Sequence, residues 1–228
     1  MENYFNYFTE IEEHFQSRRG SLLILSTLDW ALIETWKDAG IPLAVVLRGI
    51  DETFDAYERK PSKSRKVNGL GFCTQEVLAA AEQAAEAAVG TTPLEKKDAG
   101  LEQKEVAEYL EHNAVRLEKV RIPDPAHTLA QLTVLNLREL AKETATTSAF
   151  RAEDLERRLS VMEEKIFAAL LASTSDDAIL SVRIEADRDL APYRGKMTGP
   201  QIEQLHKQYV HKRILERYQV PRLSLFYM

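Results

Sequence analysis

Cysteine, glycine and long apolar runs are all scarce in this sequence of 228 residues. With Cys73 as the one cysteine, no disulfide can form within the chain, which fits a reducing compartment. No segment approaches the roughly 18 apolar residues needed to span a bilayer. The first twenty residues lack a basic stretch followed by an apolar run, so we expect no secretory signal. These absences predict a cytoplasmic protein.

Catalytic signatures are also missing: the sequence has no Walker-type phosphate loop, no G-x-G-x-x-G and no G-x-S-x-G. Glu203 and His206 have the Glu-x-x-His spacing of di-iron bundles, but a second copy is absent. His206 and His211 are five residues apart, which does not match the i,i+4 pair of a zinc motif. Cys73 has apolar neighbours and is interpreted as a packed thiol. We therefore expect no enzyme activity, no cofactor and no metal.

What the sequence does contain indicates an all-α protein. Alanine, leucine, glutamate, lysine and arginine are abundant, and apolar residues recur at spacings of three and four. A helix is predicted over residues 4–16, with Gly20 as its C-cap. Ser26 and Asp29 form a capping-box pattern for the next helix, which Ala39 and Gly40 end. Residues 22–25 are a short apolar run that is either a buried strand or a connector.

Two helical parts are expected. Residues 1–90 form an N-terminal helical module, residues 91–100 a polar linker with glycine and proline, and residues 101–228 a helical bundle. Within the bundle, Leu129, Leu132, Leu135 and Leu140 mark the apolar face of one helix. The bundle ends in an extended apolar tail.

A basic turn is the sharpest local feature. Five of the eight residues from 59 to 66 are cations, whereas residues 1–58 hold four lysines and arginines against eleven acidic residues. Such a turn is a candidate phosphate site, and its alternative is a solvated turn that offsets the acidic helices around it. The candidate nucleic-acid contacts are Arg59, Lys60, Lys63, Arg65 and Lys66.

Aromatic residues near the basic turn allow two interpretations. They are either core residues at helical spacing or surfaces on which nucleic-acid bases stack, and the core is favoured except for Trp30. The set is Trp30, Trp36, Phe54, Tyr57 and Phe72.

The C-terminal tail is the second informative stretch, because a free apolar chain end would be costly to expose. It either packs back onto the helices, which we favour, or is held by a protein partner. The candidate partner-binding residues are Leu223, Leu225, Phe226 and Tyr227. Arg194, Lys196, Arg213, Arg217 and Arg222 form a candidate second basic surface.

Residues 28–78 resemble the helical module of DnaD-type primosomal proteins. The resemblance is carried by DWALIETWKDAGIPLAVVLRGIDETF, the basic turn and KVNGLGFCTQEVL. Glu76 stands where the family pattern has isoleucine, if Phe72 takes the place of its tyrosine. The resemblance implies contact with DNA and with a helicase or helicase-loader ATPase.

The leading expectation is a non-enzymatic accessory protein that touches nucleic acid through the basic turn and a protein through its C-terminal half, and the resemblance implies a role in DNA replication. The alternative is a structural or adaptor protein that binds no nucleic acid, whose helices bury against an oligomer or a partner. An enzyme of unrecognised type is the third.

Overall fold

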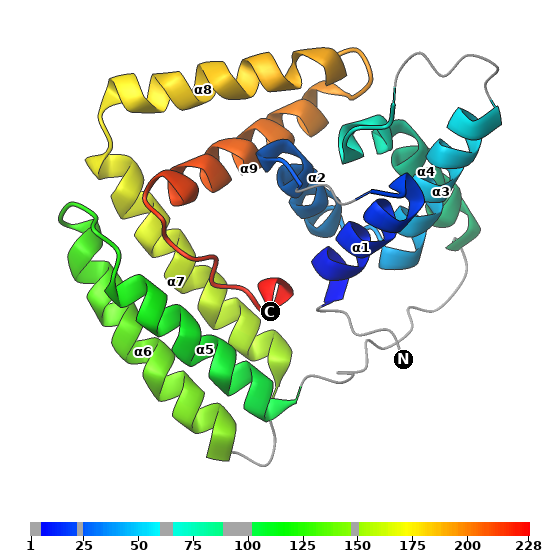
Figure 1. Ribbon diagram of the computed structural model, residues 1–228. Helices are drawn as coiled ribbons and strands as arrows, with labels where there is room; N and C mark the ends of the chain where they lie inside the picture. The colour runs from blue at the N-terminus through cyan, green and yellow to red at the C-terminus, as the bar shows by residue number, and fades with distance from the viewer. Residues whose placement is uncertain (1–5, 22–24, 60–65, 89–101, 147–150) are drawn as a thin grey trace. The chain divides into compact units, whose positions relative to one another are not determined.

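The computed structural model describes residues 6–21, 25–59, 66–88, 102–146 and 151–228 (Figure 1). These residues form α-helices and short 3-10 turns with no strand, which confirms the all-α prediction. None of the helices described is both long and apolar enough to cross a membrane. The expected linker at residues 91–100 and most of the short apolar run at 22–25 lie outside the described residues, while Leu25 is buried.

Contacts divide the chain into two compact units. The first comprises residues 7–96 and 185–209 and is called the α1–α4 unit. The second comprises residues 1–6, 97–184 and 210–228 and is called the tail unit. This division differs from the sequence-based one, which kept residues 101–228 together. Gln208 Nε2 donates to Asp38 Oδ2 at 2.7 Å, and the ring of Tyr193 lies against Gly71, so residues 185–209 pack with the first unit.

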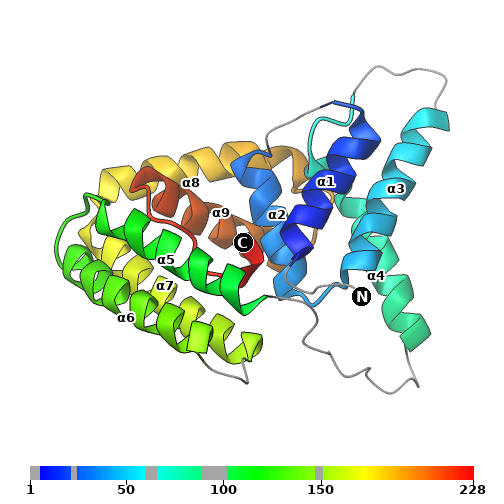
Figure 2. The same ribbon diagram turned by 60° about the horizontal axis from the view of Figure 1, so that its bottom comes forward.

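The α1–α4 unit is built on α1 (Tyr7–Arg19), α2 (Thr27–Asp38), α3 (Leu43–Arg59) and α4 (Thr74–Ala88), with the 3-10 turn η2 (Leu70–Phe72) before α4. Its core is lined by large side chains from α1, α2 and α3, among them Phe8, Phe15, Ile33, Trp36 and Ile50. α1 and α4 both pack on α3 (Figure 2). α1 also contacts α2, and η2 contacts both α2 and α4.

The predicted helix ends are present. Ser26 and Asp29 make the capping box of α2, because each side chain accepts a hydrogen bond from the other's backbone N–H. Gly20 and Gly40 follow α1 and α2 with φ of +71°, the left-handed conformation that glycine adopts at low cost. The Tyr7 hydroxyl donates to the carbonyl of Ile41, which fastens α1 to the α2–α3 turn.

The tail unit contains α5 (Gln103–Glu118), α6 (Ala126–Thr146) and α7 (Ala152–Ser173), the first part of α8 (Asp176–Leu190) and the last part of α9 (Gly199–Arg217). The 3-10 turn η3 (Ala191–Tyr193) lies between α8 and α9 in the other unit, and η4 (Leu225–Tyr227) ends the chain. α6 packs on both α5 and α7.

One part of the apolar pattern of α6 was interpreted wrongly. Leu132 and Leu135 are 53% and 63% exposed, and the buried stripe instead runs through Ala130, Val134, Leu137 and Ala141. Leucine at helical spacing did not identify the inner face, because small residues allow α5 to approach α6 closely.

The close contact of α3 with α4 yields a prediction. A Cβ on Gly49 would lie 2.5 Å from the Cα of Val77, closer than real Cβ atoms come to backbone. Gly49→Ala should therefore lower the free energy of unfolding by about 1–3 kcal/mol through overpacking. Chemical denaturation followed by circular dichroism measures this.

The matched control is Gly195→Ala, because nothing lies within 4 Å of a Cβ at that position. It should leave stability unchanged or raise it by up to about 1 kcal/mol. Equal stability of the two variants would contradict the close approach of α3 and α4.

Candidate functional site

The basic turn follows α3, and the structure describes its first and last cations. Arg59 is the last residue of α3 and is exposed, with its Nε donating to the carbonyl of Asp55 at 3.0 Å. Lys66 is exposed where the chain is described again. Lys60, Lys63 and Arg65 lie outside the described residues. Neither Arg59 nor Lys66 forms an ion pair with a carboxylate of the described chain.

Two acidic residues of α3, Asp51 and Asp55, are engaged by α1, while Glu58, next to Arg59, is exposed. Arg18 Nη1 lies 3.0 Å from Asp51 Oδ1, and Arg18 Nη2 pairs with Asp55. His14 Nε2 lies 2.9 Å from the same oxygen of Asp51. The hydrogen bond to Asp55 is the largest of the effects that raise the pKa of Arg18 above its usual value. These carboxylates therefore stabilise the α1–α3 packing through Arg18 and His14.

Arg19 is a further cation that the sequence interpretation treated only as part of a helix end. Its Nη2 donates to the side-chain oxygen of Asn68 at 3.4 Å, which brings the end of α1 to the chain just after Lys66. Its Nη1 is buried and has no hydrogen-bond partner among the described atoms. The predicted C-cap at Gly20 indicated that Arg19 lies at the end of a helix.

A buried carboxylate fixes the chain on the far side of the basic turn. Asp29, 4% exposed, accepts a hydrogen bond from the backbone N–H of Leu70 at 2.7 Å through Oδ1. Its Oδ2 accepts from the N–H and the hydroxyl of Ser26. A Cβ on Gly69 would lie 2.9 Å from Asp29 Oδ1, and Gly71 lies against the ring of Tyr193. The backbone at Gly69 and Gly71 therefore lies too close to Asp29 and Tyr193 to leave room for a side chain.

The aromatic residues near the turn are mostly core. Trp36 and Phe54 are buried, and the ring of Trp30 stacks on Phe8 with centroids 5.6 Å apart. Phe72 is the exception at 38% exposed, and the Lys196 ammonium lies 5.9 Å from the centre of its ring. Tyr57 is partly exposed.

Cys73 is fully buried, and its burial raises its thiol pKa to about 12, so the thiol stays protonated at neutral pH. This agrees with a packed thiol.

No cluster of three or more potential metal ligands occurs in the part of the chain that the structure describes. His206 faces Asp187 at 3.8 Å, and His211 lies edge-on to the ring of Phe167, with centroids 4.1 Å apart. The side chain of His211 is largely buried. Three arginines of the second basic surface pair with carboxylates: Arg194 with Asp187, Arg213 with Glu216 and Arg222 with Glu163.

The C-terminal tail packs back, as favoured from the sequence. Leu223, Leu225 and Phe226 are buried within the chain, and Tyr227 is partly exposed beside the Arg222 guanidinium, 4.8 Å from its ring centre. A partner could therefore reach the first three of these candidate partner-binding residues only after the tail had left its site.

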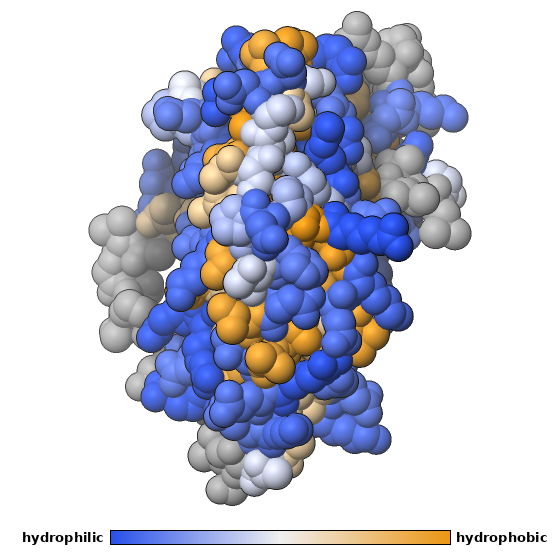
Figure 3. Space-filling model, turned by 90° about the vertical axis from the view of Figure 1, so that its left-hand side faces the viewer, coloured by the Kyte–Doolittle hydropathy of each residue, from blue (hydrophilic) through white to orange (hydrophobic). Residues whose placement is uncertain are grey.

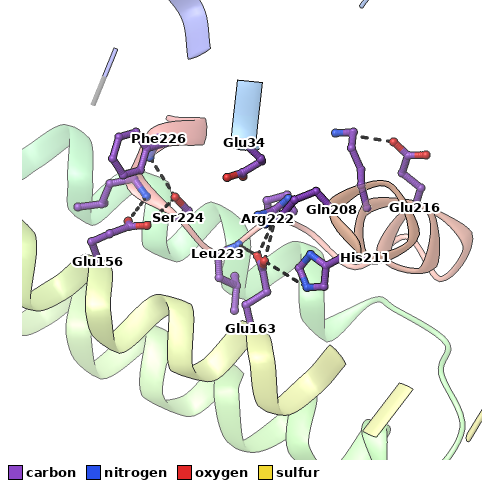
Figure 4. A network of polar contacts seen from close by, with 12 residues as sticks. Glu34, Glu156, Glu163, Gln208, His211, Glu216, Arg222, Leu223, Ser224 and Phe226 are labelled. Carbon is purple, nitrogen blue, oxygen red and sulfur yellow. Dashed lines mark hydrogen bonds and ion pairs between the residues drawn. The ribbon is translucent and has the colours of Figure 1, made fainter. Parts of the chain in front are cut away.

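Two glutamates of α7 hold the tail through its backbone (Figure 4). Glu163 accepts from the N–H of Leu223 at 2.6 Å, and its Oε1 lies 3.0 Å from Arg222 Nε. Glu156 accepts from the N–H of Leu225 and the hydroxyl of Ser224, both at 2.7 Å. Both carboxylates thus accept hydrogen bonds from a stretch of backbone that no strand or helix pairs.

Tyr109 of α5 contacts the tail from another helix. Its hydroxyl lies 2.7 Å from the carbonyl oxygen of Ser224 and 3.0 Å from that of Arg222, so its hydrogen is donated to either one. Burial raises the pKa of Tyr109 to about 12, which keeps the hydroxyl a donor at neutral pH.

The anchor at Asp29 leads to a second prediction. Asp29→Asn replaces one acceptor oxygen with a donor, so either Leu70 or Ser26 loses the partner of its backbone N–H. The free energy of unfolding should fall by about 1–3 kcal/mol, and the Leu70 amide should exchange its hydrogen faster. Denaturation and hydrogen exchange measure the two effects.

Asp177→Asn is the control, because Asp177 is exposed in the first turn of α8. It should change stability by no more than about 0.5 kcal/mol. An unchanged exchange rate at Leu70 in Asp29→Asn would refute the role of Asp29.

The third prediction concerns the tail. Glu163→Ala removes the carboxylate beside the largely buried Arg222 and leaves the Leu223 N–H without its acceptor. It should cost about 2–4 kcal/mol and make the tail accessible to carboxypeptidase. Glu164→Ala, at the exposed neighbouring position, should leave both properties unchanged. Equal digestion of the two variants would show that Glu163 does not hold the tail.

Comparison with known proteins gives one similarity. Residues 6–92 match the model of a family that is described as an uncharacterised protein. This stretch includes α1, α2, α3 and α4. No curated protein and no solved structure matches the chain.

Proposed function

We propose that this chain is a non-enzymatic accessory protein that contacts nucleic acid through the basic turn of residues 59–66. The observation that carries the proposal is the engagement of Asp51 and Asp55 by Arg18 and His14. Because the Arg18 guanidinium already pairs with both carboxylates, they do not pair with Arg59 or Lys66. The charge of the turn is then available to an external polyanion.

Charge density and anchoring support the same proposal. Five cations within eight residues stand out in a chain whose net charge is −6. Lysine and arginine bind the phosphate backbone by releasing its counterions, which gives affinity without reading the base sequence. The chain is held in place on both sides of the turn. Arg59 ends α3 before it, and the N–H of Leu70 donates a hydrogen bond to Asp29 after it. Arg19, beside Asn68, adds a sixth cation.

A role in DNA replication, with a helicase or helicase-loader ATPase as partner, is the narrower form of the proposal. It rests on the resemblance of residues 28–78 to the DnaD-type module. In this form the protein partner binds the C-terminal half. Because the tail packs back, the partner would meet exposed apolar residues of α6 and α7 rather than Leu223, Leu225 and Phe226.

An adaptor without nucleic-acid binding is the second candidate, and a specific observation favours it. Hydrophobic residues lie among hydrophilic ones on the face drawn in Figure 3. The large apolar side chains exposed on α6, α7 and the tail-unit part of α8 are Leu132, Leu135, Val161, Leu180 and Ile184. If they form one contiguous patch, a protein partner would cover them.

The fourth prediction tests nucleic-acid binding in the full chain. Changing Arg59, Lys60, Lys63, Arg65 and Lys66 to glutamine should weaken binding to a fluorescent DNA at least tenfold, because the phosphate contacts are lost. For the unaltered chain, log affinity should fall with log salt concentration by about 0.9 per phosphate contact on duplex DNA. Fluorescence anisotropy across a salt series measures both.

The control changes five exposed cations of the tail unit to glutamine and so alters net charge by the same amount: Arg116, Lys119, Arg121, Lys165 and Arg183. Its DNA affinity should stay within about threefold, since the phosphate contacts of the basic turn are kept. DNA affinity that survives the change in the basic turn would refute the site. A chain without DNA affinity that retains a protein partner after nuclease treatment would be the adaptor.

A further inference from the structure

The hydrogen bonds that join the tail to helices are made with distant parts of the chain. Polar contacts join Arg222, Leu223, Ser224 and Leu225 to α5 or α7, across sequence separations from 59 to 115 residues. None of them requires the tail and its binding groove on α5 and α7 to belong to the same molecule. A tail supplied by a second copy would find the same two carboxylates and the same tyrosine.

The connection between α9 and the tail is strained at one residue. The N–H of Val220 donates to the carbonyl of Leu215 at 2.9 Å, and that of Gln219 to the carbonyl of Glu216 at 3.0 Å, which is a Schellman motif. Gln219 occupies the left-handed position with φ of +57° and is the one non-glycine residue with positive φ in the described chain. Its side chain makes this conformation unfavourable.

Gly40 shows what this position ordinarily contains. After α2 the same two hydrogen bonds are made, from Ile41 to Trp36 and from Gly40 to Lys37, and glycine takes the left-handed conformation with φ of +71°. The chain thus carries the strain-free version of the motif at one helix end and the strained version where the tail begins.

We propose that the tail exchanges between two copies of this chain, with Gln219 as the hinge. In the exchanged pair each tail lies in the groove of the other copy, and the hinge residue is free to leave the left-handed region. Strain in a short hinge favours such exchange, which gives a closed two-fold dimer. The buried Leu223, Leu225 and Phe226 make a free tail unfavourable, so the tail occupies one groove or the other.

Variants at the hinge provide the first part of the test, with the full chain at several concentrations and light scattering after size exclusion. Gln219→Gly relaxes the closed form and should lower the dimer association constant about tenfold, since two hinges are affected. Gln219→Pro cannot adopt positive φ and should raise the dimer fraction. A chain that remains monomeric at every concentration, with Gln219→Pro as well, overturns the proposal.

Isotope mixing decides whether a dimer is formed by exchange. Arg222→Lys places an amine beside the Glu163 carboxylate, and a carbodiimide then joins the two as an amide. In a refolded equal mixture of ¹⁵N-labelled and unlabelled chains, exchange produces crosslinked peptides with one labelled and one unlabelled partner. Crosslinks between peptides of like label alone would show that each tail stays on its own chain. That result overturns the proposal even if a dimer is present.

Discussion

Carboxylates that accept hydrogen bonds from irregular backbone are the interaction on which both units depend. Asp29 accepts from Leu70 in the α1–α4 unit, and Glu156 and Glu163 accept from Leu225 and Leu223 in the tail unit. In each case the segment that donates these hydrogen bonds lies outside the α-helical hydrogen-bond ladder and would otherwise bury unpaired N–H groups. The short connections are therefore fixed by single side chains on helices, which have defined positions.

Local chemistry made much of the fold predictable. The capping box at Ser26, the glycine ends at Gly20 and Gly40, and the helix from Leu43 onward all follow from residues within a few positions of one another. The close approach at Gly69 and Gly71 was also predictable, although the neighbours Asp29 and Tyr193 were not. Features that depend on contacts between residues far apart in the chain cannot be predicted from the local sequence. The assignment of residues 185–209 to the α1–α4 unit is one of them.

The candidate sites show the same difference between features with a local signal and features that depend on packing. A dense cluster of cations can be read directly from the sequence, whereas the engagement of Asp51 and Asp55 by α1 depends on how two helices pack. The apolar tail was recognised, but Glu156 and Glu163 looked like ordinary exposed residues of a charged helix. For Leu132 and Leu135 the local pattern was misleading: their spacing indicated the core, but both side chains are exposed.

Cys73 gives the α3–α4 packing a chemical reporter. The thiol precedes α4, is fully buried and is protonated at neutral pH. A thiol-reactive dye therefore cannot react with it while α3 and α4 are packed together. Because the chain has one cysteine, dye incorporation counts only the molecules in which this packing has opened. The rate of labelling therefore measures how often the α3–α4 packing opens, and no cysteine has to be introduced.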